Sequence, residues 1–263
     1  NAGAAVDGHY RWAYRLNYAR NVFADFQYGR VGAMIGIAFV FAGWFVGRVI
    51  YGYVHHFAFR LSQEIHAAYI EIYPENPPHF APKKSILTPI KTKISQPYYC
   101  LFFALLFALC DWLNEDIFTA ICWAYFCSLL FVISVVDGYY RLISPALCQN
   151  LFALGLGAAY WQITPLTLEQ SLQSAVIFFA VFSLIYYGAK EYYKQEAFGR
   201  GDCWLALGLG TFFSYEQLPA FLLLACLSGL VYALYHKLNK RHVTAIPFGP
   251  FLSLSSVLCR LLN

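Results

Sequence analysis

The feature that most constrains this chain is a series of eight apolar segments, separated by stretches that hold most of its charge. They lie at residues 31–53, 97–113, 117–136, 144–161, 171–188, 203–213, 217–235 and 248–262. A helix crosses the hydrocarbon core of a bilayer with about 20 mostly apolar residues. Most segments approach that length, although the sixth is short and the eighth is relatively polar. Backbone groups in lipid must be paired within the segment, so we predict an all-α, polytopic integral membrane protein with about eight transmembrane helices.

The composition excludes several other classes of protein. Of 263 residues, 60% are hydrophobic and only 12% are charged, whereas a soluble domain carries about 25% charged residues. A chain with so few ionic groups cannot cover a water-facing surface. We therefore exclude a soluble enzyme, a disordered chain and, despite the net charge of +4, a nucleic-acid-binding domain, and expect membrane lipid as a partner.

The charges between the segments predict an orientation. Every lysine lies in alternate loops, together with Arg60, Arg141, Arg200 and Arg241. The intervening loops and their edges contain acids but neither Lys nor Arg: Asp111, Glu115, Asp116, Glu169 and Glu216. Because loops rich in Lys and Arg stay in the cytoplasm, the basic loops are predicted to face the cytoplasm from a bacterial inner membrane.

Two regions stand apart from the membrane segments. Residues 1–30 carry four arginines, although an even number of spans would place both ends of the chain outside. We interpret them as an N-terminal extension that either lies on the membrane surface or is not native sequence. Residues 31–263 form the predicted membrane domain, with a first cytoplasmic loop at about 54–96.

The cysteines and histidines do not form a metal-binding pattern. None of the eight cysteines belongs to a CxxC pair, and nearly all lie inside apolar segments, where Cys acts as a small hydrophobic residue. The seven histidines are scattered. We predict neither a metal site nor a cofactor.

Two acidic residues occupy positions that solvation alone does not explain. Asp137 ends the third apolar segment and Asp202 begins the sixth, which places both at the same membrane face. An acid near hydrocarbon is costly and is a functional candidate by default, although Asp202 could simply cap a helix that begins at Cys203. Gly199 and Gly201 precede Asp202 on a backbone that could take positive φ. Two carboxyl groups at one depth can share a proton, as in aspartic proteases.

A third unusual element precedes the last apolar segment. Pro247, Phe248, Gly249 and Pro250 follow one another, and two prolines with a glycine break a regular helix. Irregular backbone at membrane depth must be buried in protein or line a wet cavity. The segment could therefore line a substrate path, or simply start a helix with Pro250 in its first turn.

Together these residues resemble the type 4 prepilin peptidases, a family of GxGD-type aspartic proteases. The matching pieces are the Gly-Arg-Gly-Asp run at 199–202 with flanks at 194–198 and 205–208, Asp137 followed by Leu142 and Ile143, and the block at 245–252. The resemblance spans about residues 31–263 and is strongest to the short form of Haemophilus-type bacteria, which lacks a cytoplasmic zinc-binding insert.

The resemblance implies a function and a set of site residues. The family cleaves the basic leader peptide from type IV prepilins and pseudopilins, after a glycine, at the cytoplasmic membrane face. Asp137 and Asp202 carry over as the catalytic pair, and Gly199, Arg200 and Gly201 as the active-site loop. Archetypes also N-methylate the product with S-adenosylmethionine and carry two CxxC pairs in the first loop. This chain lacks those pairs, so the resemblance supports cleavage more firmly than methylation.

Two other classes of function stay open at this point. Intramembrane acids and broken helices also mark membrane transporters, although these aspartates lie at a membrane edge rather than at the midplane. An inactive relative that only binds pilins during assembly is the other alternative. The oligomeric state is not predicted.

Overall fold

The computed structural model describes residues 3–75, 94–114, 116–194, 199–239 and 246–262, with side chains from residue 32 onward except that of residue 33. These residues form eight α-helices and no strands, which confirms the predicted all-α class. The helices are α1 Gly3–Ile72, α2 Gln96–Leu113, α3 Ile117–Tyr140, α4 Pro145–Tyr160, α5 Leu168–Tyr193, α6 Arg200–Gly210, α7 Leu218–Leu238 and α8 Gly249–Leu262, with the short 3-10 helix η2 Tyr215–Gln217 before α7.

The helices differ in their ability to cross a bilayer. Five apolar stretches are long enough, in α1, α2, α3, α5 and across η2 and α7. The other three helices are shorter, with 16 residues in α4, 11 in α6 and 14 in α8. At about 1.5 Å per residue, α6 is only about 16 Å long. The chain is a multi-pass membrane protein in which short helices lie beside longer spans.

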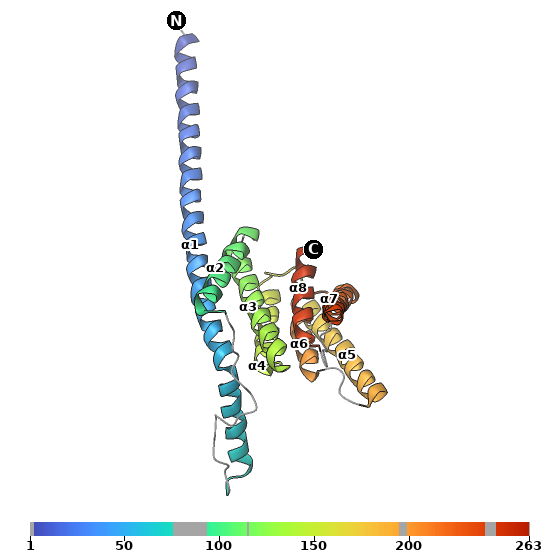
Figure 1. Ribbon diagram of the computed structural model, residues 1–263. Coiled ribbons are helices and arrows are strands. Elements are labelled where there is room, and N and C mark those ends of the chain that lie inside the picture. The colour runs from blue at the N-terminus through green and yellow to red at the C-terminus, as the bar shows by residue number, and fades with distance from the viewer. Residues whose placement is uncertain (1–2, 76–93, 115, 195–198, 240–245, 263) are drawn as a thin grey trace.

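The first helix is longer than the sequence predicted. We expected a span at residues 31–53 and a loop at 54–96, but α1 continues to Ile72 and projects beyond the other helices at both ends (Figure 1). Residues 54–72 include three Ala and two Glu, which favour helix, and also His, Arg, Ser and Gln, which make them less apolar than the preceding span. The rest of the predicted loop, at 76–93, lies outside the described residues. The predicted extension is helical from Gly3, but its side chains are also outside the description.

Two glycines fix the contact between α1 and α2. A Cβ atom on Gly43 would lie 2.3 Å from the carbonyl oxygen of Phe103, and one on Gly47 would lie 2.6 Å from that of Tyr99. The two backbones are therefore in direct contact along a Gly-xxx-Gly stripe, a common packing device of membrane helices.

The helix α6 lies at the centre of the remaining bundle, in contact with α4, α5 and α8. Small residues permit this packing: a Cβ on Gly208 would approach the carbonyl oxygen of Cys148 on α4 at 3.1 Å, and one on Gly210 would approach the Cα of Ala175 on α5 at 2.7 Å. After α6 ends, the Ser171 hydroxyl donates to the carbonyl of Thr211 at 2.8 Å. The central helix is thus held by close backbone contacts on two sides.

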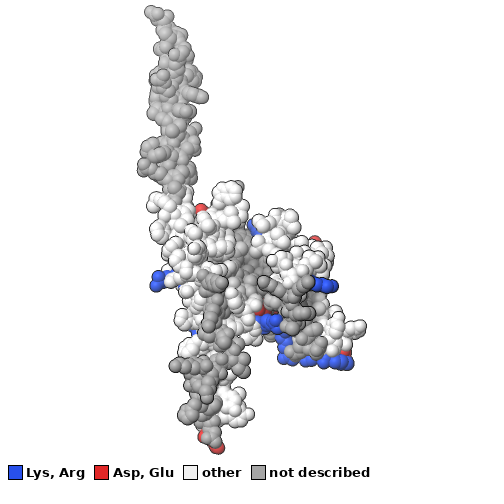
Figure 2. Space-filling model, viewed as in Figure 1, with Lys and Arg blue, Asp and Glu red and all other residues white. Residues whose placement is uncertain are grey.

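The bundle has two chemically different ends. The C-terminal ends of α3 and α5 and the N-terminal ends of α4, α6 and α8 lie at the same end, which is the lower one in Figure 1. Basic residues gather there, and their blue atoms are visible in Figure 2 below α5 and α6. Those at these helix ends are Arg141, Lys190, Lys194 and Arg200. We refer to this as the basic end.

The opposite end is formed by the C-terminal ends of α2, α4 and α8 and the N-terminal ends of α3 and α5 (Figure 1). It holds the acids of the intervening loops that the structure describes: Asp111, Asp116, Glu169 and Glu216. Arg260, in the last turn of α8, is a basic residue at this end.

Candidate active site

Asp137 lies in the last turn of α3, where the helix meets α8. Arg141 ends the helix in a left-handed conformation with φ of 54°, and its backbone N–H donates to the carbonyl of Asp137. The carboxyl group is buried and accepts a 2.9 Å hydrogen bond from the backbone N–H of Gly249. Because Gly249 is the first residue of α8, the partial positive charge of that helix end also faces the carboxyl group.

The same contact explains why residue 249 is a glycine. A Cβ atom there would lie 2.7 Å from Oδ2 of Asp137, which is closer than any carbon and oxygen can approach without displacement. The glycine therefore permits the backbone amide to reach the carboxyl oxygen.

Asp202 lies in the first turn of α6, at the same end of the bundle. The helix begins at Arg200 with Gly199 as its N-cap, so Asp202 is not the cap of a helix starting at Cys203. Its side chain is buried and receives a hydrogen bond from the backbone of Gly199. The α6 N-terminus thus presents a carboxyl group inward rather than toward solvent.

Gly199 and Gly201 do not have the positive φ angles that the sequence led us to consider. Gly199 has φ of −79°, and no glycine in the described part of the chain has positive φ. Close approach is the physical reason instead: a Cβ on Gly201 would lie 2.8 Å from the Cβ of Ile143, in the connection between α3 and α4. Gly201 therefore lets the start of α6 lie against the chain that follows Asp137.

The structure brings the two acids together. Both are about 5% exposed, and Asp202 lies near enough to Asp137 to be affected by its charge, in addition to the larger effect of its own burial. Oδ1 of Asp202 is buried and has no hydrogen-bond partner among the described residues. A buried oxygen of this kind needs a polar partner, so the arrangement can accept a water molecule or a polar group of a substrate.

The Pro-rich segment before α8 is irregular from Ile246 to Phe248. Pro250 lies in the first turn of α8, as one of the two sequence interpretations expected. Pro247 and Phe248 are half-buried, and Phe248 packs against the main hydrophobic core. The segment therefore delivers Gly249 to Asp137, and its function as a substrate path stays a prediction.

Arg200 is exposed but contacts Tyr186, a buried tyrosine of α5 that belongs to the main hydrophobic core. Its Nε donates to the hydroxyl of Tyr186 at 3.1 Å, and its guanidinium lies 5.9 Å from the centre of the same ring. This contact holds the loop between α5 and α6 at its α6 end. Residues 195–198 of that loop, which carry part of the motif flank, lie outside the described residues.

Sequence reasoning missed two elements of this site. It marked Gly249 as part of a possible path but not as the amide donor to Asp137, which requires knowing how α8 approaches α3. It did not identify Tyr186, because a tyrosine inside an apolar segment carries no signal of a contact with residue 200. Among the described residues, no group of His, Cys, Asp and Glu side chains could hold a metal ion.

Comparison with known proteins identifies the family of this chain. Residues 124–234 match the type IV leader peptidase family, and this stretch includes both Asp137 and Asp202. A prepilin leader peptidase/N-methyltransferase of Haemophilus influenzae is 39% identical over 230 residues, which cover 86% of this chain and 96% of that protein. The chain belongs to the type IV leader peptidase family. The members of this family are aspartic proteases. This chain is therefore a hydrolase, and its family makes it an aspartic-type protease.

Other members of the family are similar over shorter stretches. A prepilin leader peptidase/N-methyltransferase of Escherichia coli K12 is 34% identical over 145 residues, covering 54% of this chain and 63% of that protein. The leader peptidase HopD of Salmonella typhimurium is 32% identical over 103 residues, covering 38% of this chain and 66% of that protein. No solved structure gives a significant match.

Proposed function

We propose that this leader peptidase cleaves the basic leader from type IV prepilins and pseudopilins, with Asp137 and Asp202 as its catalytic pair. The two relatives described above that cover more than half of this chain are both named prepilin leader peptidase/N-methyltransferase. The observation that carries the proposal is the meeting of two buried carboxyl groups, from different helices, at one end of an apolar bundle. Such a pair has no structural benefit that would offset the cost of burying it.

The chemistry needs only the pair and a water molecule. Two buried carboxyl groups that affect each other's charge cannot both ionise at low cost, so in this proposal the pair holds one shared proton. The ionised carboxylate takes a proton from the water, whose oxygen attacks the scissile carbonyl, while the protonated carboxyl donates to the carbonyl oxygen. The tetrahedral intermediate then breaks its C–N bond as a proton passes to the leaving amine. The amides of Gly249 and Gly199 hold the two carboxyl groups in place.

The location of the pair fits a substrate that is itself a membrane helix. The basic end of the bundle is the one we assign to the cytoplasm of the inner membrane, and both aspartates lie at that end. A prepilin would keep its apolar helix in the bilayer and its basic leader in the cytoplasm. The bond between them would then lie at the depth of the pair, and a glycine before the bond lets the substrate backbone unwind.

The test compares aspartate-to-asparagine variants in a prepilin cleavage assay. We expect Asp137→Asn and Asp202→Asn each to lower the cleavage rate by at least about a thousandfold, since each removes one of the two proton-transfer groups. The matched control is Asp111→Asn, which changes an acid at the opposite end of the bundle. Mass spectrometry of detergent-solubilised enzyme with a prepilin measures the released leader.

The possible outcomes separate the candidate functions. Substantial cleavage by either active-site variant would refute the assignment of the pair. An intact substrate with the wild-type enzyme would favour the transporter or the inactive pilin-binding factor. Because the Haemophilus relative is also named an N-methyltransferase, the same spectra, recorded with S-adenosylmethionine present, report methylation as a product heavier by one methyl group.

A further inference from the structure

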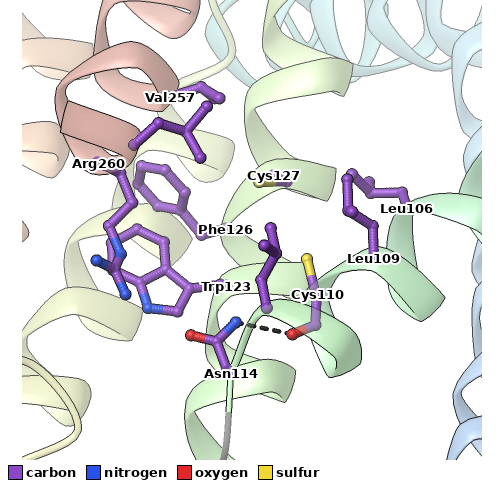
Figure 3. Close-up of a pocket in the computed structure, with 11 residues that line it drawn as sticks. Leu106, Leu109, Cys110, Asn114, Trp123, Phe126, Cys127, Val257 and Arg260 are labelled. Carbon is purple, nitrogen blue, oxygen red and sulfur yellow. Dashed lines mark hydrogen bonds between the residues drawn. The ribbon is translucent and has the colours of Figure 1, made fainter.

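An apolar cavity lies at the end of the bundle opposite the aspartates. Its volume is about 310 Å³, it is partly open, and residues of α2, α3 and α8 line it (Figure 3). The side chains that form most of its wall are Leu106, Leu109, Trp123, Phe126, Cys127 and Val257. A single water needs only about 15 Å³ but also needs polar partners, which this wall does not supply. The cavity suits an apolar chain rather than solvent.

One cation lies at the edge of this cavity. The guanidinium of Arg260 is 4.6 Å from the centre of the Trp123 ring, and Figure 3 shows the two side chains next to each other. Asn114 lines the same cavity. The Asn114 side chain donates to the carbonyl of Cys110 at 2.7 Å, which fixes its orientation. No Asp or Glu is among the residues that line the cavity. Within the described part of the chain, the site therefore combines an apolar wall with one positive charge at its rim and no lining carboxylate.

Exposed aromatic residues place this rim at the membrane surface. Trp112 at the end of α2 is 81% exposed, and Trp161 at the end of α4 is 73% exposed. Tyr160 and Phe118, at the same end, are also exposed. Trp and Tyr gather at the boundary between hydrocarbon and headgroups. Arg260 thus lies at headgroup depth, with the cavity wall directly beneath it.

We propose that this cavity binds one anionic glycerophospholipid, with an acyl chain between α2, α3 and α8 and the phosphate on Arg260. A cation beside an apolar cavity at this depth matches the two chemical parts of such a lipid. An anionic lipid such as phosphatidylglycerol fits better than phosphatidylethanolamine, because none of the described residues that line the site has a carboxylate to receive an ammonium group. The site is separate from the proposed catalytic pair, and its test does not depend on prepilin cleavage.

The experiment measures lipid retention by the full chain. Purified protein is stripped of lipid in detergent, titrated with phosphatidylglycerol or phosphatidylethanolamine, and examined by native mass spectrometry. We expect one phosphatidylglycerol to bind the wild type, and Arg260→Gln to bind it about tenfold more weakly, as the loss of one charge-assisted contact implies. The control Arg48→Gln removes another exposed arginine, on α1 and away from the cavity, and should bind as the wild type does.

A second variant tests the acyl-chain half of the site. Val257→Phe fills the cavity while leaving Arg260 in place, and we expect it to lose the bound lipid. If Val257→Phe does not fold, the comparison of the two arginine variants decides alone. Equal retention by Arg260→Gln and Arg48→Gln, equal affinity for the two lipids, or a second copy of the chain in place of lipid would each overturn the proposal.

Discussion

At the scale of single residues, Gly249 shows how closely the candidate site is packed. Its backbone amide reaches Asp137 at 2.9 Å, and a methyl group in place of its hydrogen would come to 2.7 Å from the same carboxyl oxygen. The residue therefore supplies a hydrogen-bond donor and leaves space for the acceptor at the same time. No other amino acid can do both at this position.

Gly249→Ala should therefore lower kcat/KM for prepilin cleavage by about a hundredfold, because a carboxyl group displaced by a fraction of an ångström to an ångström loses its reactive geometry. The control is Gly229→Ala on α7, where a Cβ would meet the Phe251 ring at an ordinary 3.6 Å. Steady-state kinetics on both variants, with circular dichroism to confirm folding, measures the difference. Equal rates for the two variants would show that the contact has no catalytic consequence.

Only part of the site could be read from single residues. Asp137 and Asp202 were recognisable because an acid next to hydrocarbon is costly, and their prediction as a pair followed from both lying at one membrane face. The functions of the glycines were not recognisable in the same way. A glycine signals freedom in φ as readily as close approach, and only the positions of Asp137 and Ile143 in space distinguish the two at Gly249 and Gly201.

At the scale of elements, helix packing in this bundle depends on small residues. The stripe of Gly43 and Gly47 brings α1 against α2, and Gly208 and Gly210 bring α6 against α4 and α5. Lipid supplies no hydrophobic driving force between helices, so close van der Waals contact has to supply the association energy. A methyl group at such a position separates two helices.

Gly43→Ala tests this at the contact between α1 and α2. A Cβ at 2.3 Å from the Phe103 carbonyl oxygen should cost about 1–3 kcal/mol of overpacking, and lower the Tm in detergent by a few degrees. Gly52→Ala on the same helix is the control, since no atom lies within 4 Å of its Cβ position, and the higher helix propensity of Ala should leave its Tm equal or slightly raised. A Tm for Gly43→Ala at or above that of Gly52→Ala would contradict the packing argument.

Element boundaries were the least predictable feature of the fold. Apolar runs located all eight helices, because burial in lipid requires them. They failed at α1, where helix continues from residue 54 to Ile72 without an apolar run, and at α6, which begins at Arg200 rather than Cys203. In both places hydropathy does not mark where the helix begins or ends.

At the scale of the whole molecule, charge divides the bundle into a basic end that contains the two aspartates and an opposite end that contains Asp111, Asp116, Glu169 and Glu216. The basic end would face the cytoplasm under the rule that Lys and Arg remain on that side. This division was predictable, since it follows from the alternation of loops along the sequence. The packing of α3, α6 and α8 next to one another was not predictable from hydropathy, because apolar patterns do not indicate which helices are neighbours.

The orientation can be measured by labelling single cysteines in spheroplasts with a membrane-impermeant maleimide. With the exposed Cys226 replaced by serine, Glu216→Cys should react from outside, because residue 216 belongs to the acidic end. Lys194→Cys should react only after the membrane is permeabilised. The parent without either new cysteine is the control, and labelling of Lys194→Cys in intact spheroplasts would reverse the proposed topology.

The hydrogen bond from Gly249 to Asp137 also has a consequence for biosynthesis. Of the helices described, α8 is the last in chain order, and proteins are made and begin to fold from the N-terminus. A nascent chain that has inserted α1 to α7 therefore has both acids but lacks the amide that holds one of them. We therefore expect the chain to become active only after α8 has been inserted, so that an incomplete chain would not cleave prepilins in the same membrane.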